Sequence, residues 1–308
     1  MHFRISILKK YLTKFSFVSL LLISSIAQAQ NYIDLLKIDY ALGKGNNFKD
    51  GTGSSDVQEF TIDATVPIVL SDKNTFLTGL LFEQVRVTVY ADQPDVSVYT
   101  LNLKLGLNTI LSDTWSATFM TLPKISSDFE TVGKNDFQLG LLSIFKKTIN
   151  TNLNYKFGAY FNTELFGPFV VPLLGVYYKK NKWETTVMLP MSMDVNYLLA
   201  EPFRVGLKFS GFQKTFHLNT PYNGDHYVTK ANNELGGYLS YTYKNIYFVG
   251  MIGHSIGRSY RIYEVGNQLK LAISVVKIGD NRTQLNTDFE DGFVFRTSVF
   301  YRLNLAKQ

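Results

Sequence analysis

The stretch 292-GFVFRTSVFYRLNL-305 decides the fold of this chain, because its residues alternate between two kinds of side chain. One set begins at Phe293 and is largely apolar, whereas the other set includes Arg296, Ser298 and Arg302. This period of two is the pattern of a β-strand with one apolar face and one mostly polar face. The stretch is as long as a strand that crosses a bilayer at a tilt, which needs about 9–11 residues in the hydrocarbon. It therefore predicts a membrane-spanning strand.

The first 29 residues are organised like a secretory signal peptide. Basic residues precede an apolar run over 15–27, and Ala27-Gln28-Ala29 is a small-x-small cleavage site. We expect cleavage after Ala29, which leaves residues 30–308 as one mature domain. A retained membrane anchor is the alternative, but the apolar run is short for a spanning helix.

The composition narrows the classes of protein to which the chain can belong. The signal peptide carries four of the 31 Lys and Arg residues and no Asp or Glu, so the mature chain has a formal charge of only +2. We see no cluster of basic residues and expect no nucleic-acid partner. The chain has no cysteine, which excludes disulfides and a lipid-modified cysteine.

Charged residues make up 18% of the chain, fewer than the roughly 25% of a soluble domain. After the signal peptide, however, no apolar run approaches the roughly 18 residues of a spanning helix. Because every backbone group must be paired in lipid, alternating apolar residues predict a closed barrel.

Alternating segments recur along the mature chain and predict an all-β fold, a transmembrane antiparallel up-and-down β-barrel of about fourteen strands. The segments 183–190 and 193–199 are short and are bracketed by Pro190 and Pro202. If they form one bent strand, the barrel has twelve strands. The predicted strands are 32–43, 56–69, 74–90, 97–110, 114–122, 136–146, 153–163, 169–179, 183–190, 193–199, 203–217, 231–243, 246–263 and 289–305.

The connections between these strands alternate in length. Short turns face the periplasm and long loops face outward in outer-membrane barrels, so the alternation predicts the orientation. The segment 265–279 fits a short strand or an amphipathic helix, and we place it in the last outward loop, where it could fold inward as a constriction. The short turns are 71–74, 112–114, 179–182, 200–202 and 243–245, and the long loops are 43–55, 123–135, 218–230 and 264–288.

Trp115 and Trp183 each follow a predicted short turn directly. This places both indoles at one membrane interface, where amphipathic rings are most stable. Tryptophans in the core of an exported soluble sandwich are the alternative. The periplasmic girdle would also contain Tyr177, Tyr178, Tyr241, Tyr243 and Tyr247.

Over its mature length the chain resembles families of Gram-negative outer-membrane β-barrel proteins of unknown function. The signal peptide, the turn-Trp units and the closing strand over 294–302 carry the resemblance. It implies Sec-type export to the cell outer membrane, with the lipid bilayer, lipopolysaccharide and the barrel assembly machinery as partners. Such barrels commonly end on an aromatic residue, whereas this chain continues past Tyr301 to Gln308.

Two patterns raise the possibility of an enzyme. Gly253-His254-Ser255-Ile256-Gly257 matches the G-x-S-x-G nucleophile elbow, but it lies in an alternating strand, where His254 and Ser255 point to opposite faces. A membrane-embedded lipid hydrolase with His217 or His226 as its base is a second hypothesis, for which no serine motif is found. We expect no catalytic residues and no enzymatic activity.

Metal binding has little support, because none of the four histidines has a metal-ligand spacing to a carboxylate partner. Four acids in the last loop could hold calcium or cations that bridge lipopolysaccharide, although a solvated acidic loop explains them as well. We expect no metal and no cofactor. The four acids are Asp280, Asp288, Glu290 and Asp291.

The predicted inward faces carry charges of both signs, with acids on the first two strands and bases on the middle and last strands. Barrel closure would bring Arg296 or Arg302 to Asp39 and Asp63. The predicted lumen-lining residues are Asp39, Glu59, Asp63, Lys104, Lys156, Arg204, Lys208, Arg296 and Arg302.

These charges suit a passive pore or an uptake channel for small solutes. Gly106, Gly158 and Gly206 share the inward faces and are expected to leave room beside the charges. A non-transporting structural or surface-interaction barrel, whose interior is filled by salt bridges, is the alternative.

Overall fold

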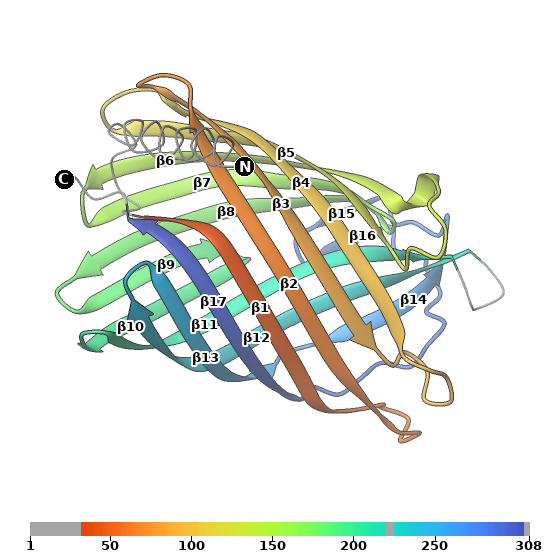
Figure 1. Ribbon diagram of the computed structural model, residues 1–308. Coiled ribbons are helices and arrows are strands. Elements are labelled where there is room, and N and C mark those ends of the chain that lie inside the picture. Colours follow the sequence, from red (N-terminus) through yellow and green to blue (C-terminus); the bar gives the residue numbers. More distant parts are fainter. Residues whose placement is uncertain (1–31, 220–224, 305–308) are drawn as a thin grey trace, which may run out of the picture.

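The computed structural model describes residues 32–219 and 225–304, so the predicted signal peptide lies outside the described residues. Fourteen strands form one closed antiparallel barrel, as predicted. Each strand pairs with the next along the chain, and β17 (Phe293–Asn304) closes the ring between β13 (Ile246–Ser255) and β1 (Tyr32–Asn47). Figure 1 shows the red β1 beside the blue β17. No helix in the described part of the chain is long and apolar enough to cross a membrane.

The shortest strands of the wall are β9 (Trp183–Leu189) and β10 (Ser192–Ala200). They are separate and pair antiparallel, so the twelve-strand alternative is wrong. The other strands of the wall are β2 (Ser54–Val69), β3 (Asn74–Val87), β4 (Val96–Ile110), β5 (Trp115–Ser127), β6 (Phe137–Asn150), β7 (Leu153–Glu164), β8 (Gly167–Lys180), β11 (Phe203–Leu218) and β12 (His226–Tyr243).

The two ends of the barrel differ, and we name them the turn end and the loop end. Short turns join the strands at the turn end, on the left in Figure 1. Most connections at the loop end, on the right, are longer, but those from β7 to β8 and from β9 to β10 are as short as the turns. The strand ends at the loop end differ from the prediction in both directions. β5 continues to Ser127 and β12 begins at His226, whereas β3 ends at Val87 and β17 begins only at Phe293. The predicted loops 123–135 and 218–230 are therefore too long.

The last connection at the loop end has strands of its own. After β13 the chain bends at Gly257, whose φ of +64° favours glycine, and continues as β14 (Ser259–Glu264) beside β12. The hairpin of β15 (Leu271–Ile273) and β16 (Val276–Ile278) follows. The segment 265–279 is thus a short hairpin within the last loop. A single 3₁₀ turn, η1 (Lys134–Asp136), precedes β6.

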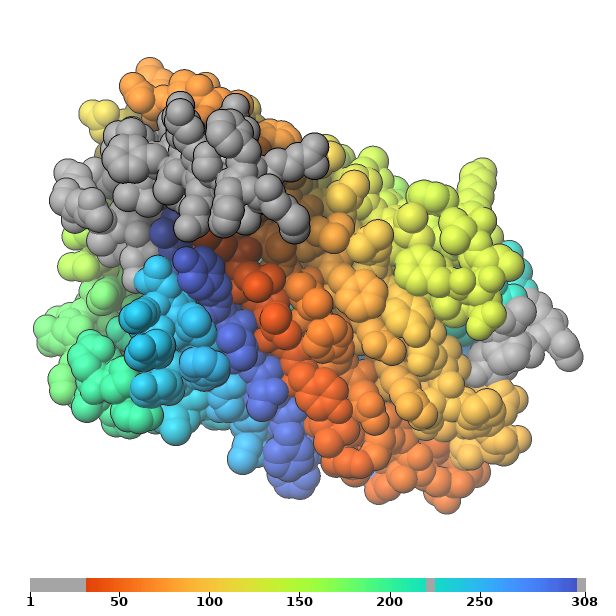
Figure 2. All heavy atoms as spheres, in the orientation of Figure 1, coloured from red at the N-terminus to blue at the C-terminus, as the bar shows by residue number. Residues whose placement is uncertain are grey.

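The outward faces of the strands are apolar, as the sequence alternation requires. Leu103, Phe157, Leu207 and Ile252 are all exposed on the outer surface, which is the face that a membrane barrel presents to lipid. Figure 2 shows β1 to β4 and β17 as inclined bands across one side of the barrel.

The aromatic girdle at the turn end is only partly as predicted. The rings of Trp183, Tyr178, Tyr241 and Tyr243 are exposed near this end. Tyr177 is buried instead, and with Tyr247 it lines an internal chamber. Including these two tyrosines in the girdle is wrong, because their positions lie on the inward faces of their strands.

Toward the loop end, β11 leaves the outer wall and crosses the barrel. It pairs with β10 only as far as Ser210. Beyond that point it reaches β5 on the opposite wall, where Asp128 donates its backbone N–H to the carbonyl of His217 at 3.1 Å. We call the loop-end parts of β11, β12 and β14, residues 211–218, 226–233 and 259–264, the septum.

The septum has an apolar cluster on each side. Phe216, Val228 and Ile262 pack on one side with residues of β2, β3 and β4. Tyr227 and Tyr263 pack on the other side with residues that include Phe166 in the connection from β7 to β8. The loop-end half of the barrel interior is therefore filled by side chains.

Candidate functional site: the barrel interior

A layer of buried ion pairs joins the septum to the opposite wall. Lys230 on β12 is fully buried, and its Nζ lies 2.7 Å from Glu59 Oε1 on β2 and 3.0 Å from Glu83 Oε1 on β3. Lys214 on β11 forms an ion pair with the other oxygen of Glu83. The hydroxyl of Tyr260 donates to Glu59 over 3.2 Å. Two strands of the septum are thus bound to two strands of the wall.

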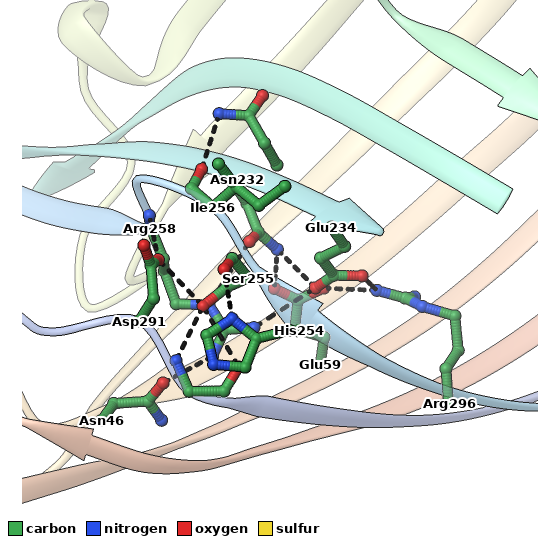
Figure 3. Close-up of polar contacts among 12 residues, drawn as sticks. Asn46, Glu59, Asn232, Glu234, His254, Ser255, Ile256, Arg258, Asp291 and Arg296 are labelled. Atoms are coloured by element: carbon green, nitrogen blue, oxygen red, sulfur yellow. Dashed lines mark hydrogen bonds and ion pairs between the residues drawn. The ribbon is translucent and has the colours of Figure 1, made fainter. Parts of the chain in front are cut away.

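The layer continues around Glu234, as Figure 3 shows. Arg296 on β17 lies 2.7 Å from Glu234 Oε2 and 3.5 Å from Glu59 Oε2. Arg258 lies 3.4 Å from Glu234 Oε1 and donates to Asn46 Oδ1 over 2.7 Å. Because these groups come from several strands, the layer depends on the complete barrel.

The layer is stable only as a unit. Its cations are Lys214, Lys230, Arg258 and Arg296, and its anions are Glu59, Glu83 and Glu234, so it carries one net positive charge. A buried charge is costly without a partner, and removal of one member of such a pair typically costs about 3–5 kcal/mol. The layer is therefore a closed, strongly coupled element of the interior.

A second polar cluster lies on the other face of the septum, against β5, β6 and β7. Lys124 Nζ lies 3.0 Å from Glu164 Oε1, and both side chains are buried. Thr215 on the septum donates its hydroxyl to Glu164 Oε2 over 2.5 Å and accepts from the backbone N–H of Leu165 over 3.0 Å. Gln138 also contacts Thr215. These bonds fix the septum on its second side.

The turn-end half of the interior contains a chamber of about 360 Å³, within the range of about 300–1,000 Å³ for small-molecule sites. It extends from Tyr32 and Lys179 near the turn end to Ser192 beside the turn between β9 and β10. Aromatic rings line it, among them Tyr238 and Tyr247. The chamber is polar enough to hold water and wide enough for a small solute.

Most charges of the chamber have partners within it. Arg302 binds both oxygens of Asp34, at 2.6 and 3.0 Å, and Arg204 donates to Asn196 over 2.9 Å. Asp194 accepts from the hydroxyl of Tyr238 over 2.8 Å. Lys208 also lines the chamber, opposite Asp194 in the register of β10 and β11, but none of the ion pairs in the described part of the chain includes it.

Five of the nine residues expected in the lumen lie in the ion-pair layer or around the chamber, and the other four lie in neither region. Asp39 is buried and contacts Lys37 and Ser298, and Asp63 pairs with Lys104. Lys156 on β7 stands opposite Lys146 on β6. The other members lie in the ion-pair layer (Glu59 and Arg296) and around the chamber (Arg204, Lys208 and Arg302).

The predicted charge pairs across the closing seam are wrong. Arg296 binds Glu59 and Glu234, and Arg302 binds Asp34, so neither arginine forms an ion pair with Asp39 or Asp63. The strand neighbours were right. Arg302 pairs across the seam, but with Asp34, its register partner on β1, and the long side chain of Arg296 reaches Glu59 on β2 and Glu234 on β12.

The expectation that three glycines leave open room is also wrong. A Cβ at Gly206 would meet the ring of Tyr238 at 2.6 Å, and a Cβ at Gly106 would meet Met120 Cγ at 2.4 Å. At Gly158 it would meet the carbonyl oxygen of Ser143 at 2.0 Å. The space is occupied by neighbouring side chains or by closely approaching backbone.

The G-x-S-x-G motif lies at the end of β13 and in the bend that follows, not inside a continuous strand as predicted. Ser255 is buried and its hydroxyl donates to Asp291 over 3.0 Å, whereas the ring of His254 contacts the carbonyl of Ser255 and packs against Phe293. The ring of His254 therefore does not bond to the hydroxyl of Ser255. The motif therefore has no nucleophile–base pair.

His217 at the loop end is not placed to act as a base either. Both ring nitrogens of His217 contact carboxylates, Nδ1 with Asp136 over 2.6 Å and Nε2 with Asp225. A general base needs one free nitrogen within reach of the group that it deprotonates, and His217 offers none. His226 is buried at the start of β12.

The four acids of the last loop have separate partners. Hydrogen bonds from Arg282 hold the pKa of Asp280 below its ordinary value, and those from Arg261 do the same for Asp288. Glu290 contacts Asn47, and Asp291 accepts from Ser255. Across residues 32–219 and 225–304, no three His, Cys, Asp or Glu side chains are grouped so that they could hold a metal ion.

Sequence reasoning missed the septum, although the alternation of β11 contains a signal for it. Phe203 and Leu207 face lipid, but Gln213, Thr215 and His217 continue the same face with polar side chains. A polar lipid-facing row is unfavourable in a membrane barrel. The change from apolar to polar side chains at Gln213 marks the place where β11 leaves the wall and enters the interior.

The family described as "Domain of unknown function (DUF6268)" matches residues 26–270. No curated protein matches the sequence. Among solved structures, an outer membrane channel from Pseudomonas putida F1 is 8% identical with a TM-score of 0.45, covering 91% of this chain and 98% of that chain.

Two further solved structures have a similar degree of likeness. A FadL homologue of Pseudomonas aeruginosa is 10% identical with a TM-score of 0.44, covering 90% of this chain and 91% of that one. The toluene transporter TodX of Pseudomonas putida is 10% identical with a TM-score of 0.38, covering 91% and 92%.

Proposed function

The chain belongs to the family described as a domain of unknown function (DUF6268), and we propose that it is an outer-membrane channel for small anionic solutes, closed at the loop end in this structure. The lipid-facing belt, the antiparallel closure and the short turns at one end support the outer membrane as its location. Catalysis forms no part of the proposal.

One observation carries the choice of anions. Lys208 faces the chamber without an ion-pair partner among the described residues, although most other charges of the chamber are paired. The nearby carboxylates of Asp194 and Asp39 offset part of this charge, but a chamber cation that is not tied in an ion pair still attracts anions and repels cations. The ion-pair layer above the chamber adds one net positive charge along the same path.

Passage of a solute requires the septum to move. The backbone bond between Asp128 and His217 and the contacts of Thr215 with Glu164 and Leu165 hold it in place. Packed interfaces of this kind switch between discrete arrangements and do not deform continuously. We therefore expect brief, rare openings and not a permanently open pore.

Recordings from planar bilayers test the proposal. We expect the wild-type protein to conduct in rare openings, and Thr215→Ala to open more often because it removes hydroxyl contacts on one face of the septum. The reversal potential should show anion preference, which Lys208→Glu should shift toward cations, whereas Lys73→Glu in an exposed turn should leave it unchanged. Conductance with the same selectivity in all variants would refute the anion assignment.

A structural barrel without transport is the second candidate. Its support is the backbone pairing of β5 with β11, which ties opposite walls together in addition to side-chain contacts. If neither the wild-type protein nor Thr215→Ala conducts in a folded, membrane-inserted sample, this candidate replaces the channel.

A further inference from the structure

The short hairpin of β9 and β10 leaves a gap in the barrel wall. Strand β8 pairs with β9 only from Leu174 to Lys180, so its loop-end part has no neighbour from β9. The last loop supplies one, because β15 pairs with β8 at Phe169 and Val170. Ser274 also donates its backbone N–H to the carbonyl of Val170 over 2.8 Å. A loop segment thus takes the place of a wall strand.

The direction of β15 determines where the hairpin tip points. β15 is parallel to β8, which runs from the loop end to the turn end, so β15 descends along the wall and β16 returns. In register, Ala272 stands beside the inward-facing Phe169, and Ile273 stands beside Val170 on the outward face. The tip at Ser274 and Val275 therefore points down toward the turn between β9 and β10.

The depth of the tip follows from the register of β8. Tyr178 is exposed near the turn end, and Val170 lies about eight residues before it on the strand. With a rise of about 3.3 Å per residue and a tilt of about 40°, Val170 stands about 20 Å above Tyr178. The apolar band of such barrels is about 25 Å tall. Ile273, beside Val170, is therefore within the band, and Val275 is deeper.

The side chains of the hairpin match this depth. Val275 is 87% exposed, and Ile273, Val276 and Ile278 are exposed as well. An apolar patch of this kind is unfavourable in water and marks a surface that contacts an apolar partner. The one charged residue of the hairpin, Lys277, pairs in register with the inward-facing Ala272, and its Nζ lies 3.9 Å from Asp280. Lys277 is itself partly exposed, but it lies on the same face as Ala272, so the outward face of the hairpin carries no charged residue.

The patch is continuous with the lipid-facing surface of the wall. Below the tip, Leu174 and Leu189 face each other across β8 and β9, and both are exposed on the outside. Arg282 fixes the base of the hairpin to the septum, because it binds Asp280 at 2.7 Å and stacks 4.3 Å from the ring centre of Tyr263. The hairpin is therefore held at this level.

We propose that the β15–β16 hairpin is inserted into the membrane, where its outward face contacts the acyl chains of the leaflet at the loop end. It completes the wall above β9 and β10 and covers the apolar cluster around Phe166 and Tyr263. The inference rests on the membrane-spanning barrel and does not depend on transport or on solute charge.

Fluorescence in lipid vesicles tests this insertion. The chain has no cysteine, so Val275→Cys, a small change, can carry a single nitrobenzoxadiazole label. In phosphatidylcholine vesicles we expect blue-shifted emission and strong quenching by lipid that is spin-labelled in the middle of its acyl chain. Leu174→Cys on the wall is the lipid-facing control, and Thr283→Cys, exposed in the same loop, is the aqueous control.

The controls make the outcomes distinct. If the label at position 275 is quenched as strongly as the label at position 174, insertion is supported. If its emission and quenching match those of the label at position 283, insertion is overturned. A third outcome is blue-shifted emission without quenching by lipid, with a shift that grows with protein density in the vesicles. It would identify a second copy of the chain as the partner and would also overturn insertion into lipid.

Discussion

Asp128, just beyond the end of β5, donates its backbone N–H to the carbonyl of His217 on β11 at 3.1 Å, although β6 to β10 separate these strands along the wall. The bond is possible because β9 and β10 are short and leave the edge of β11 free beyond Gly211, which still donates its backbone N–H to the carbonyl of Met191 in the turn between them. Two short strands thus explain both the septum and the gap that the last loop fills.

The buried amine of Lys230 should be essential for the stability of the ion-pair layer. Lys230→Met leaves Glu59 and Glu83 without their shared cation, and we expect a loss of about 3–5 kcal/mol in the free energy of unfolding. Urea unfolding in detergent micelles measures it, with Lys73→Met in an exposed turn as the matched control. Equal midpoints for the two variants would show that the layer is not coupled to folding.

Two strand glycines should respond differently to alanine. At Gly158 a Cβ would approach the carbonyl oxygen of Ser143 to 2.0 Å, whereas at Gly250 nothing lies within 4 Å of it. We expect Gly158→Ala to lose about 1–3 kcal/mol, the usual cost of overpacking, and Gly250→Ala to unfold like the wild-type protein. A neutral Gly158→Ala would mean that β6 and β7 can separate at no cost.

The orientation of the barrel can be read from single cysteines. We expect Gly51→Cys and Thr283→Cys, in loop-end connections, to react with a membrane-impermeant maleimide on intact cells. Lys73→Cys and Lys244→Cys, in turns at the other end, should react only after the cells are opened. The reverse pattern would place the loop end in the periplasm.

Acid should loosen the last loop through Asp280. Hydrogen bonds from Arg282 lower the pKa of this carboxyl from its ordinary 3.8. Because the pKa is lower in the folded state, the contact stabilises the loop above about pH 4, and this stabilisation is lost as the pH falls through the folded pKa.

A label on Thr283→Cys reports this change. We expect its fluorescence anisotropy to fall on acidification below about pH 4, whereas the same label in Asp280→Asn should show low anisotropy at neutral pH and little further change. Anisotropy that does not depend on pH in the parent protein would exclude Asp280 as the anchor of this loop.

The wall of the barrel could be predicted almost completely from alternation. A strand with lipid on one side and the barrel interior on the other has a sequence period of two, and this period predicts each strand of the wall. It also predicts β9 and β10 as two separate strands, despite Pro190 and Pro202. The strand ends at the loop end were less predictable. In the septum both faces of a strand such as β12 contact protein, so the contrast between its faces fades near Val228.

The interior was less predictable than the wall. Alternation predicts that Arg296 points inward, but it does not predict which acid approaches from the far side of the barrel. Glu234 and Glu59 meet Arg296 because strands distant in sequence curve toward each other. The role of Thr215 depends likewise on a crossing of the barrel that no local pattern encodes, apart from the polar row that begins at Gln213.

The two apolar clusters that flank the septum give the two halves of this barrel different responses to temperature. Their side chains are withdrawn from water, so their packing is accompanied by a large heat-capacity change and weakens on cooling. Among residues 32–219 and 225–304, the turn-end half has no comparable water-excluding core, and its outside faces lipid. In the proposed channel, closure at the loop end should therefore be cold-sensitive while the wall around the chamber stays intact, so that cooling would loosen the septum without unfolding the wall.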